Sequence, residues 1–165
     1  MRRLALAVLL ATGPGCWELL PASRDPIRDA EHREPHVCPA GDPAYPPALF
    51  EPGEILSVAP LYYTRSQRGS QTQVLYGSIL ELRPIQGLTS EDLERLLNCH
   101  AVRSLLGRAG EPAVPNDPFW APGHVVHVRV EFDEGVTRAK VEARDFDGAQ
   151  AVLQRARAFV GQRPP

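Results

Sequence analysis

The feature that most constrains the fold is a strict apolar–polar alternation that occurs twice in succession near the carboxyl end. Between Val126 and Phe132, apolar residues alternate with histidine, arginine and glutamate. Because successive side chains of a strand point to opposite faces, this pattern gives the strand one buried face and one solvent-exposed face. A second alternating stretch, Arg138–Arg144, follows the turn residues Asp133–Gly135. The sequence therefore predicts a β-hairpin.

Two amphipathic helices are predicted on either side of this hairpin. Thr89 and Asp92 have the spacing of a capping box, which predicts a helix that runs to about Leu106. Asp147 is the predicted cap of a second helix, which is expected to end at Gly161. Apolar residues recur on one face of each helix at helical spacing, so each helix is expected to pack against a sheet.

Two earlier strands complete the predicted domain. They are Ile55–Tyr63, which Pro60 places at a sheet edge, and Val74–Arg83, with a polar loop over Thr64–Thr72 between them. The order from Val74 onward is strand, helix, strand, strand, helix. An antiparallel or mixed sheet with two helices on one face would bury all these apolar residues, so we predict an α+β, two-layer sandwich over residues 54–163. A chain of 165 residues has room for one such domain.

The first sixteen residues have the pattern of an export signal. Arg2 and Arg3 form a positive region, Leu4–Ala11 is apolar, and small residues precede Cys16. The apolar stretch is shorter than the roughly 20 residues that a membrane-spanning helix needs. We predict a signal peptide over residues 1–15 and Cys16 as the lipid attachment point of a bacterial lipoprotein. Simple secretion without acylation is the alternative.

Proline dominates the segment that follows, residues 16–53. Proline lacks a backbone donor and blocks helix interiors, so this segment is predicted to be a proline-rich tether or an irregular arm that wraps on the domain. A short helical turn is expected at most over Arg28–Glu34, and Pro35 should stop it.

The charge pattern excludes one large class of function. The formal net charge is −2, and Lys140 is the only lysine. Arginines alternate with acidic residues, so the sequence contains no basic patch of the kind that binds DNA or RNA. We therefore expect no nucleic-acid partner.

Three cysteines limit the redox chemistry, namely Cys16, Cys38 and Cys99. If Cys16 carries lipid, an even pair remains, and in an oxidising compartment Cys38 and Cys99 are a candidate disulfide. Two unpaired thiols are the alternative, because a sequence does not show whether two Cα atoms approach within the roughly 4.4–6.8 Å that the bond requires.

Few residues are candidates for metal binding. His32, His36 and Cys38 lie close in sequence and could together bind a borderline metal. Their spacing matches no compact zinc pattern, and Pro35 between the two histidines is expected to make their pairing on a helix unfavourable. We predict no cofactor.

His100 falls on the apolar face of the first predicted helix. It is expected to be a hydrogen-bonded core histidine or, alternatively, a pH-sensitive or ligand-binding group beneath the loop of residues 111–123. The sequence contains no G-x-S-x-G motif and no phosphate-binding glycine motif. We therefore predict that the protein is not an enzyme.

Two stretches resemble uncharacterised exported lipoproteins of bacteria with high-GC genomes. One is Ile55–Tyr62, and the other is Leu97–Arg103, which carries the Cys99–His100 dipeptide. The resemblance implies a shared fold and an envelope location, and it implies no activity. That group would have a further cysteine near Pro115–Phe119, and its absence here weakens a disulfide carried over for Cys99. The hairpin and the last helix also resemble part of an envelope-associated BON domain.

These observations favour an exported, lipid-anchored, non-enzymatic protein of the cell envelope with a binding or adaptor role. Its expected partners are the membrane, through lipid on Cys16, and another envelope protein, and its domain should face the periplasm or the exterior. A soluble secreted or periplasmic location is the alternative. The alternative function is a periplasmic metal- or redox-responsive protein that uses Cys38, Cys99 and the histidines.

Overall fold

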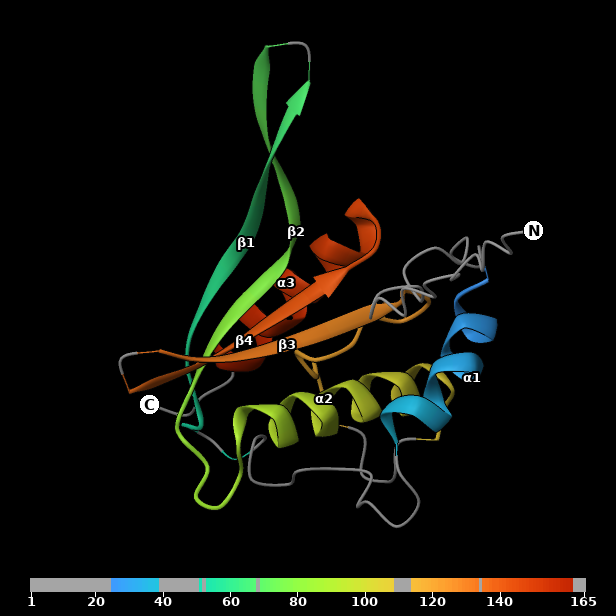
Figure 1. Ribbon diagram of the computed structural model, residues 1–165, viewed down its shortest axis with the longest axis vertical. Coiled ribbons are helices and arrows are strands. Elements are labelled where there is room, and N and C mark those ends of the chain that lie inside the picture. Colours follow the sequence, from blue (N-terminus) through green and yellow to red (C-terminus); the bar gives the residue numbers. More distant parts are fainter. Residues whose placement is uncertain are drawn as a thin grey trace, which may run out of the picture.

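A computed structural model of the chain describes residues 25–38, 51, 53–67, 69–108, 114–133 and 135–161. The predicted signal peptide and Cys16 lie outside these residues. In chain order the elements are α1 (Pro26–Val37), β1 (Ile55–Gln67), β2 (Ser70–Leu82), α2 (Ser90–Leu105), β3 (Val126–Asp133), β4 (Val136–Ala143) and α3 (Phe146–Gly161). The strands form one four-stranded antiparallel sheet in the order β1-β2-β4-β3 (Figure 1). The predicted α+β class is confirmed.

The core lies on one side of this sheet. On β4, Ala139 and Val141 are buried, whereas Lys140 between them is only partly covered. The buried strand residues share one hydrophobic cluster with Leu97 of α2 and Val152 of α3. Both helices therefore contribute to one core, α3 against β1, β2 and β4, and α2 along β3. The opposite side, here called the open face, carries Arg129, Glu131, Arg138, Lys140 and Glu142.

The hairpin of β1 and β2 projects beyond the rest of the sheet. Strand β2 pairs with β4 only over Gly77–Leu82, while its pairing with β1 continues to Gln67↔Ser70. Residues 62–67 and 70–76, here called the ribbon, therefore extend as two strands past the end of β4 (Figure 1). The prediction of a polar loop over Thr64–Thr72 is wrong. Threonine, serine and glutamine residues of this segment pair across the ribbon, and Gly69, with φ 84°, lies in the turn that joins its two strands.

Gly77 marks the point where the ribbon leaves the sheet. It has φ 151°, and a Cβ atom at this position would lie 1.9 Å from the Val141 carbonyl oxygen of β4. The backbones of β2 and β4 can approach this closely because glycine has no side chain.

Helix α1 corrects the prediction of an irregular arm for this part of the chain. Asp25 caps the helix by accepting hydrogen bonds from the backbone N–H groups of Ile27 and Arg28. The helix continues through Pro35 and ends at Val37. Proline removes only one hydrogen bond here, in the last turn, and packing of α1 against α2 offsets that loss.

A disulfide joins the end of α1 to the middle of α2. Cys38 and Cys99 are bonded, with their Cα atoms 4.9 Å apart, inside the range that the bond requires. Cys99 lies in the core, and Cys38 is the C-cap of α1. The amino-terminal helix is therefore covalently fixed to the domain.

The predicted helix starts have different outcomes. Thr89 caps α2 by accepting a hydrogen bond from the N–H of Asp92, as predicted. Helix α3 begins at Phe146 because Asp145, and not Asp147, accepts a hydrogen bond from the N–H of Gly148. Among the described residues, no helix has the length and apolar character needed to cross a bilayer.

We expect replacement of Gly77 by alanine to destabilise the domain strongly. The added Cβ would collide with the backbone of β4, so the free energy of unfolding should fall by on the order of 4 kcal/mol or more. Gly87→Ala is the matched control, since Gly87 also has positive φ, at 83°, but no atom lies near its added Cβ. It should cost about 1–2 kcal/mol. Equal losses in urea denaturation of the two variants would contradict this account.

Candidate functional site

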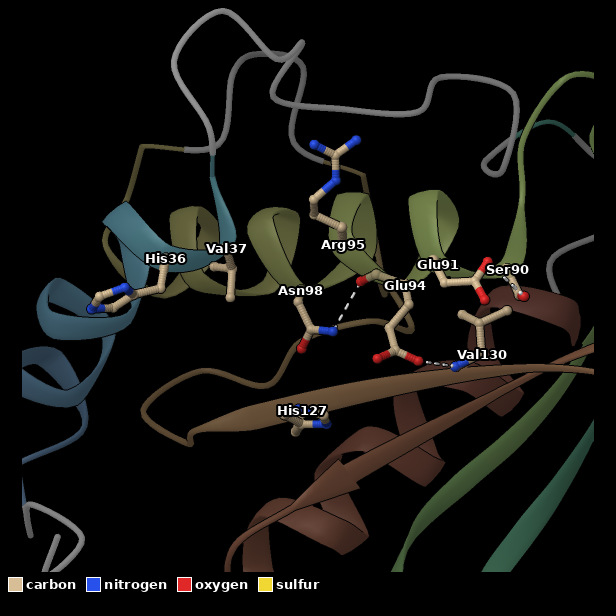
Figure 2. A pocket seen from close by; sticks show the side chains of 9 residues that line it. All are labelled: His36, Val37, Ser90, Glu91, Glu94, Arg95, Asn98, His127 and Val130. Atoms are coloured by element: carbon tan, nitrogen blue, oxygen red, sulfur yellow. Dashed lines mark hydrogen bonds between the residues drawn. The ribbon is translucent and has the colours of Figure 1, made fainter. Parts of the chain in front are cut away.

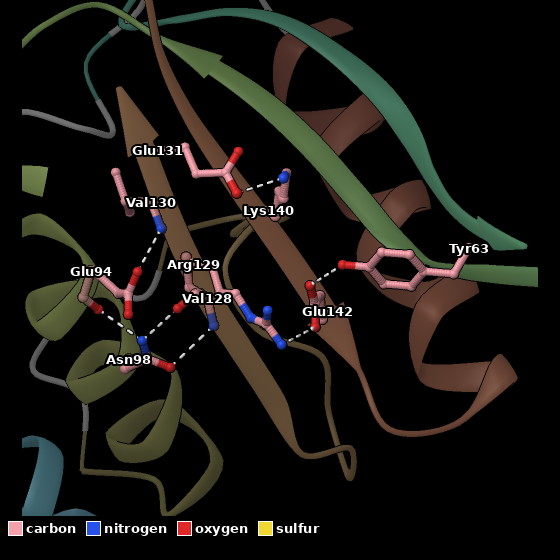
Figure 3. A network of polar contacts seen from close by, with 9 residues as sticks. All are labelled: Tyr63, Glu94, Asn98, Val128, Arg129, Val130, Glu131, Lys140 and Glu142. Atoms are coloured by element: carbon pink, nitrogen blue, oxygen red, sulfur yellow. Dashed lines mark hydrogen bonds and ion pairs between the residues drawn. The ribbon is translucent and has the colours of Figure 1, made fainter. Parts of the chain in front are cut away.

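Side chains of α2 close the free edge of β3. Asn98 contacts both backbone groups of Val128, accepting from its N–H at 3.0 Å and donating to its carbonyl at 2.6 Å. Glu94 accepts a hydrogen bond from the N–H of Val130 at 2.8 Å (Figure 3). An edge strand normally leaves such groups available for another strand, and here helix side chains occupy them.

Arg33 of α1 binds one further backbone group of the β3 edge, the carbonyl of Val126. Its guanidinium donates to the Val126 carbonyl at 3.1 Å and to the Asn98 side-chain oxygen at 3.4 Å. Burial lowers the pKa of Arg33, which the charge of Asp29 partly offsets. Helix α1 is thus fixed to the β3 edge by a partly buried cation as well as to α2 by the disulfide.

A groove of about 360 Å³ lies between α1, α2 and this edge. Figure 2 shows His36 at its α1 end and His127 on β3. The His127 Nδ1 atom is buried and has no hydrogen-bond partner among the described residues. Burial, and then the nearby charge of Arg33, lower the pKa of His127, so this imidazole is neutral at pH 7. The groove is lined by His36, Val37, Ser90, Glu91, Glu94, Arg95, Asn98, His127 and Val130.

His100 anchors the loop that follows α2. Its Nε2 atom lies 2.5 Å from Asp117 Oδ2, and both side chains are only 3% exposed. Ser104 Oγ lies 3.5 Å from the same nitrogen. A Ser-His-Asp triad needs the serine and the aspartate on opposite imidazole nitrogens, and here both meet Nε2. The trio therefore holds the loop in place and lacks the geometry for nucleophilic catalysis.

The two aromatic residues of this loop fold back on the domain. Phe119 is fully buried in the core. Trp120 lies beneath Arg155 of α3, whose guanidinium carbon is 5.0 Å from the ring centroid. Arg155 also donates a hydrogen bond to the Asp117 carbonyl, so the loop is attached to α3 as well as to α2.

The open face carries charges that pair across the strands. Lys140 lies 2.6 Å from Glu131, and Arg129 lies 3.7 Å from Glu142. From the ribbon, Tyr63 donates a hydrogen bond to Glu142 at 2.7 Å (Figure 3), and this bond raises the pKa of the Tyr63 phenol. The face is thus polar, close to neutral, and connected to the ribbon.

The candidate metal ligands are only partly brought together. His32 and His36 are exposed on α1, with their ring centroids 5.7 Å apart. Pro35 is expected to make their pairing on a helix unfavourable, but α1 is continuous through the proline and carries both histidines. Cys38 is in the disulfide and cannot join them. Within the described part of the chain, no three histidine, cysteine or acidic side chains are arranged to hold a metal ion.

Sequence reasoning missed the two residues that close the β3 edge. Asn98 and Glu94 are polar residues within α2, and only the buried position of Asn98, one residue after Leu97 on the helix, could have signalled a partner.

Comparison of the chain with protein-family models, with curated proteins and with solved structures found no match.

We expect the buried and the exposed histidine–aspartate pairs to contribute very differently to stability. His100→Ala leaves the Asp117 carboxylate buried without its histidine and should lower the free energy of unfolding by about 3–5 kcal/mol. The control is His124→Ala, because His124 pairs with Asp145 at 3.1 Å with side chains 27% and 53% exposed. Loss of that pair should cost about 0–1 kcal/mol. Chemical denaturation measures both, and similar losses would refute the anchoring role of His100.

Proposed function

We propose that this chain is an exported, lipid-anchored, non-enzymatic protein of the cell envelope that binds another envelope protein through its open face and ribbon. The observation that carries the proposal is the asymmetry of the sheet. Helices α2 and α3 contribute to the core on one side, whereas no described helix covers the centre of the other side, which α1 reaches at Arg144 through Asp29. The sheet also continues into a projecting two-stranded ribbon. The open face and the ribbon together are the surface that we assign to the partner.

The chemistry of this surface supports a protein partner. Tyrosine and arginine are enriched at the centres of protein interfaces, because each offers a large contact area together with hydrogen bonds. Tyr62 is 49% exposed and Tyr63 is 39% exposed on the ribbon, and Arg129 is exposed on the open face. Paired charges beside them would give a partner orientation and specificity at a low cost in affinity.

Three further features support the envelope location and the non-enzymatic role. The pattern of residues 1–16 favours export and acylation at Cys16. The disulfide between Cys38 and Cys99 is typical of an oxidising compartment. Among the described residues, the histidine–aspartate–serine group of His100 is buried and has both contacts on one nitrogen.

Replacement of Cys16 by alanine should release the protein from the membrane. Without an acylated cysteine no lipid holds the chain, so it should move from the membrane fraction to the soluble fraction. Fractionation, together with the intact mass of the membrane-extracted wild type, measures this. Cys38→Ala combined with Cys99→Ala is the control that should keep the lipid. Wild-type protein that starts at another residue, or that carries no acyl mass, would refute the anchor.

The binding surface can be mapped with a photoreactive amino acid placed at single positions in living cells. We expect one discrete cross-linked species from Tyr62 or Arg129, because both are exposed on the proposed surface. Position Arg157, exposed on α3, is the control and should give none. Equal cross-linking at Arg157, or no species from any position, would contradict the assignment of this surface.

A further inference from the structure

Helix α1 carries two histidines one turn apart on its solvent side. His32 and His36 are both exposed, their ring centroids lie 5.7 Å apart, and their planes are tilted by 46°. Residues four apart on a helix lie one above the other on the same face. We propose that these two imidazoles form a binding site for a single divalent transition-metal ion, with Cu²⁺ bound most tightly and water completing the coordination.

The geometry needs little adjustment to hold an ion. An imidazole nitrogen coordinates a divalent metal at about 2.0–2.1 Å, so the two rings must approach each other slightly. Rotation about side-chain bonds achieves this at low cost for exposed side chains, because no packing resists it. The two nitrogens would then occupy neighbouring positions around the ion, as in metal sites built on histidines at i and i+4.

The helix that carries the pair is held in place before any metal binds. Cys38, two residues after His36, is bonded to Cys99 of α2. Between the two histidines, Arg33 donates to the β3 edge, and Glu34 pairs with Arg103 at 3.6 Å. A ligand pair on a fixed backbone loses less conformational freedom when it binds, which favours affinity.

The donors on this helix point to the kind of metal. Because Cys38 is in a disulfide, it offers no thiolate, and the donors that the described part of α1 presents here are the imidazole nitrogens of the two histidines. Such nitrogens suit borderline divalent ions, and the order of affinity among these ions places Cu²⁺ above Ni²⁺ and Zn²⁺. The site therefore differs from the combined histidine–Cys38 site that the sequence suggests.

Metal binding should also strengthen the end of α1. Pro35 lies between the two ligands and has no N–H to bond to the carbonyl of the preceding turn. An ion that bridges His32 and His36 would span this weakened turn. Because it binds only the folded helix, it should raise the melting temperature as its concentration rises.

The test is a Cu²⁺ titration of the full chain, purified without an affinity tag and with its disulfide intact. We expect one Cu²⁺ per chain, with a paramagnetic resonance spectrum typical of histidine nitrogen coordination. His32→Gln or His36→Gln should each weaken binding by about tenfold or more, which corresponds to about 1.4 kcal/mol or more. His124→Gln is the control, because His124 lies outside the groove that His36 lines, and it should bind as the wild type does.

A second measurement separates this site from non-specific binding. Cu²⁺ should raise the melting temperature of the wild type and should not raise that of the double variant His32→Gln, His36→Gln. Both replaced side chains are exposed, so the double variant should fold normally by circular dichroism. Unchanged Cu²⁺ affinity in the double variant, or several equivalent ions per chain in every variant, would overturn the proposal.

Discussion

The amide of Asn98 is the contact on which the arrangement of this domain most depends. By bonding to both backbone groups of Val128, it gives the last strand of the sheet the partner that a fifth strand would otherwise supply. Glu94 and Arg33 continue the same role on either side. A buried backbone group without a partner is costly, so these contacts fix α2 along β3 and give α1 its position beside both.

Closing this edge determines which surfaces remain for a partner. The β3 edge is occupied by side chains, and β1, at the other edge, contains Pro60, which lacks the N–H that a further strand would need. Strand addition is therefore disfavoured along β3 and at Pro60, whereas the outer edge of β2 over residues 70–76 lies beyond its pairing with β4. The open face and the ribbon are the surfaces that we propose for recognition, while the outer side of α1 presents the histidine pair.

Local patterns predicted those parts of the fold in which one periodicity dominates. The β3–β4 hairpin follows from alternation alone, and the start of α2 follows from Thr89. Helix α1 and the ribbon were predicted incorrectly for the same reason. Proline in α1 and polar residues in the ribbon have unfavourable or neutral local preferences, and packing on α2 or pairing across the ribbon overrides them.

The sequence by itself determined the α+β class, the hairpin, the cap of α2 and the candidate residues Cys38, Cys99, His32, His36 and His100, because these depend on neighbours along the chain. Only the tertiary structure decided what those residues contact. It joined Cys38 to Cys99, buried His100 against Asp117, and left His32 and His36 facing solvent. Each of these outcomes depends on how elements far apart in sequence pack together, and the local periodicity of the sequence contains no information about that packing.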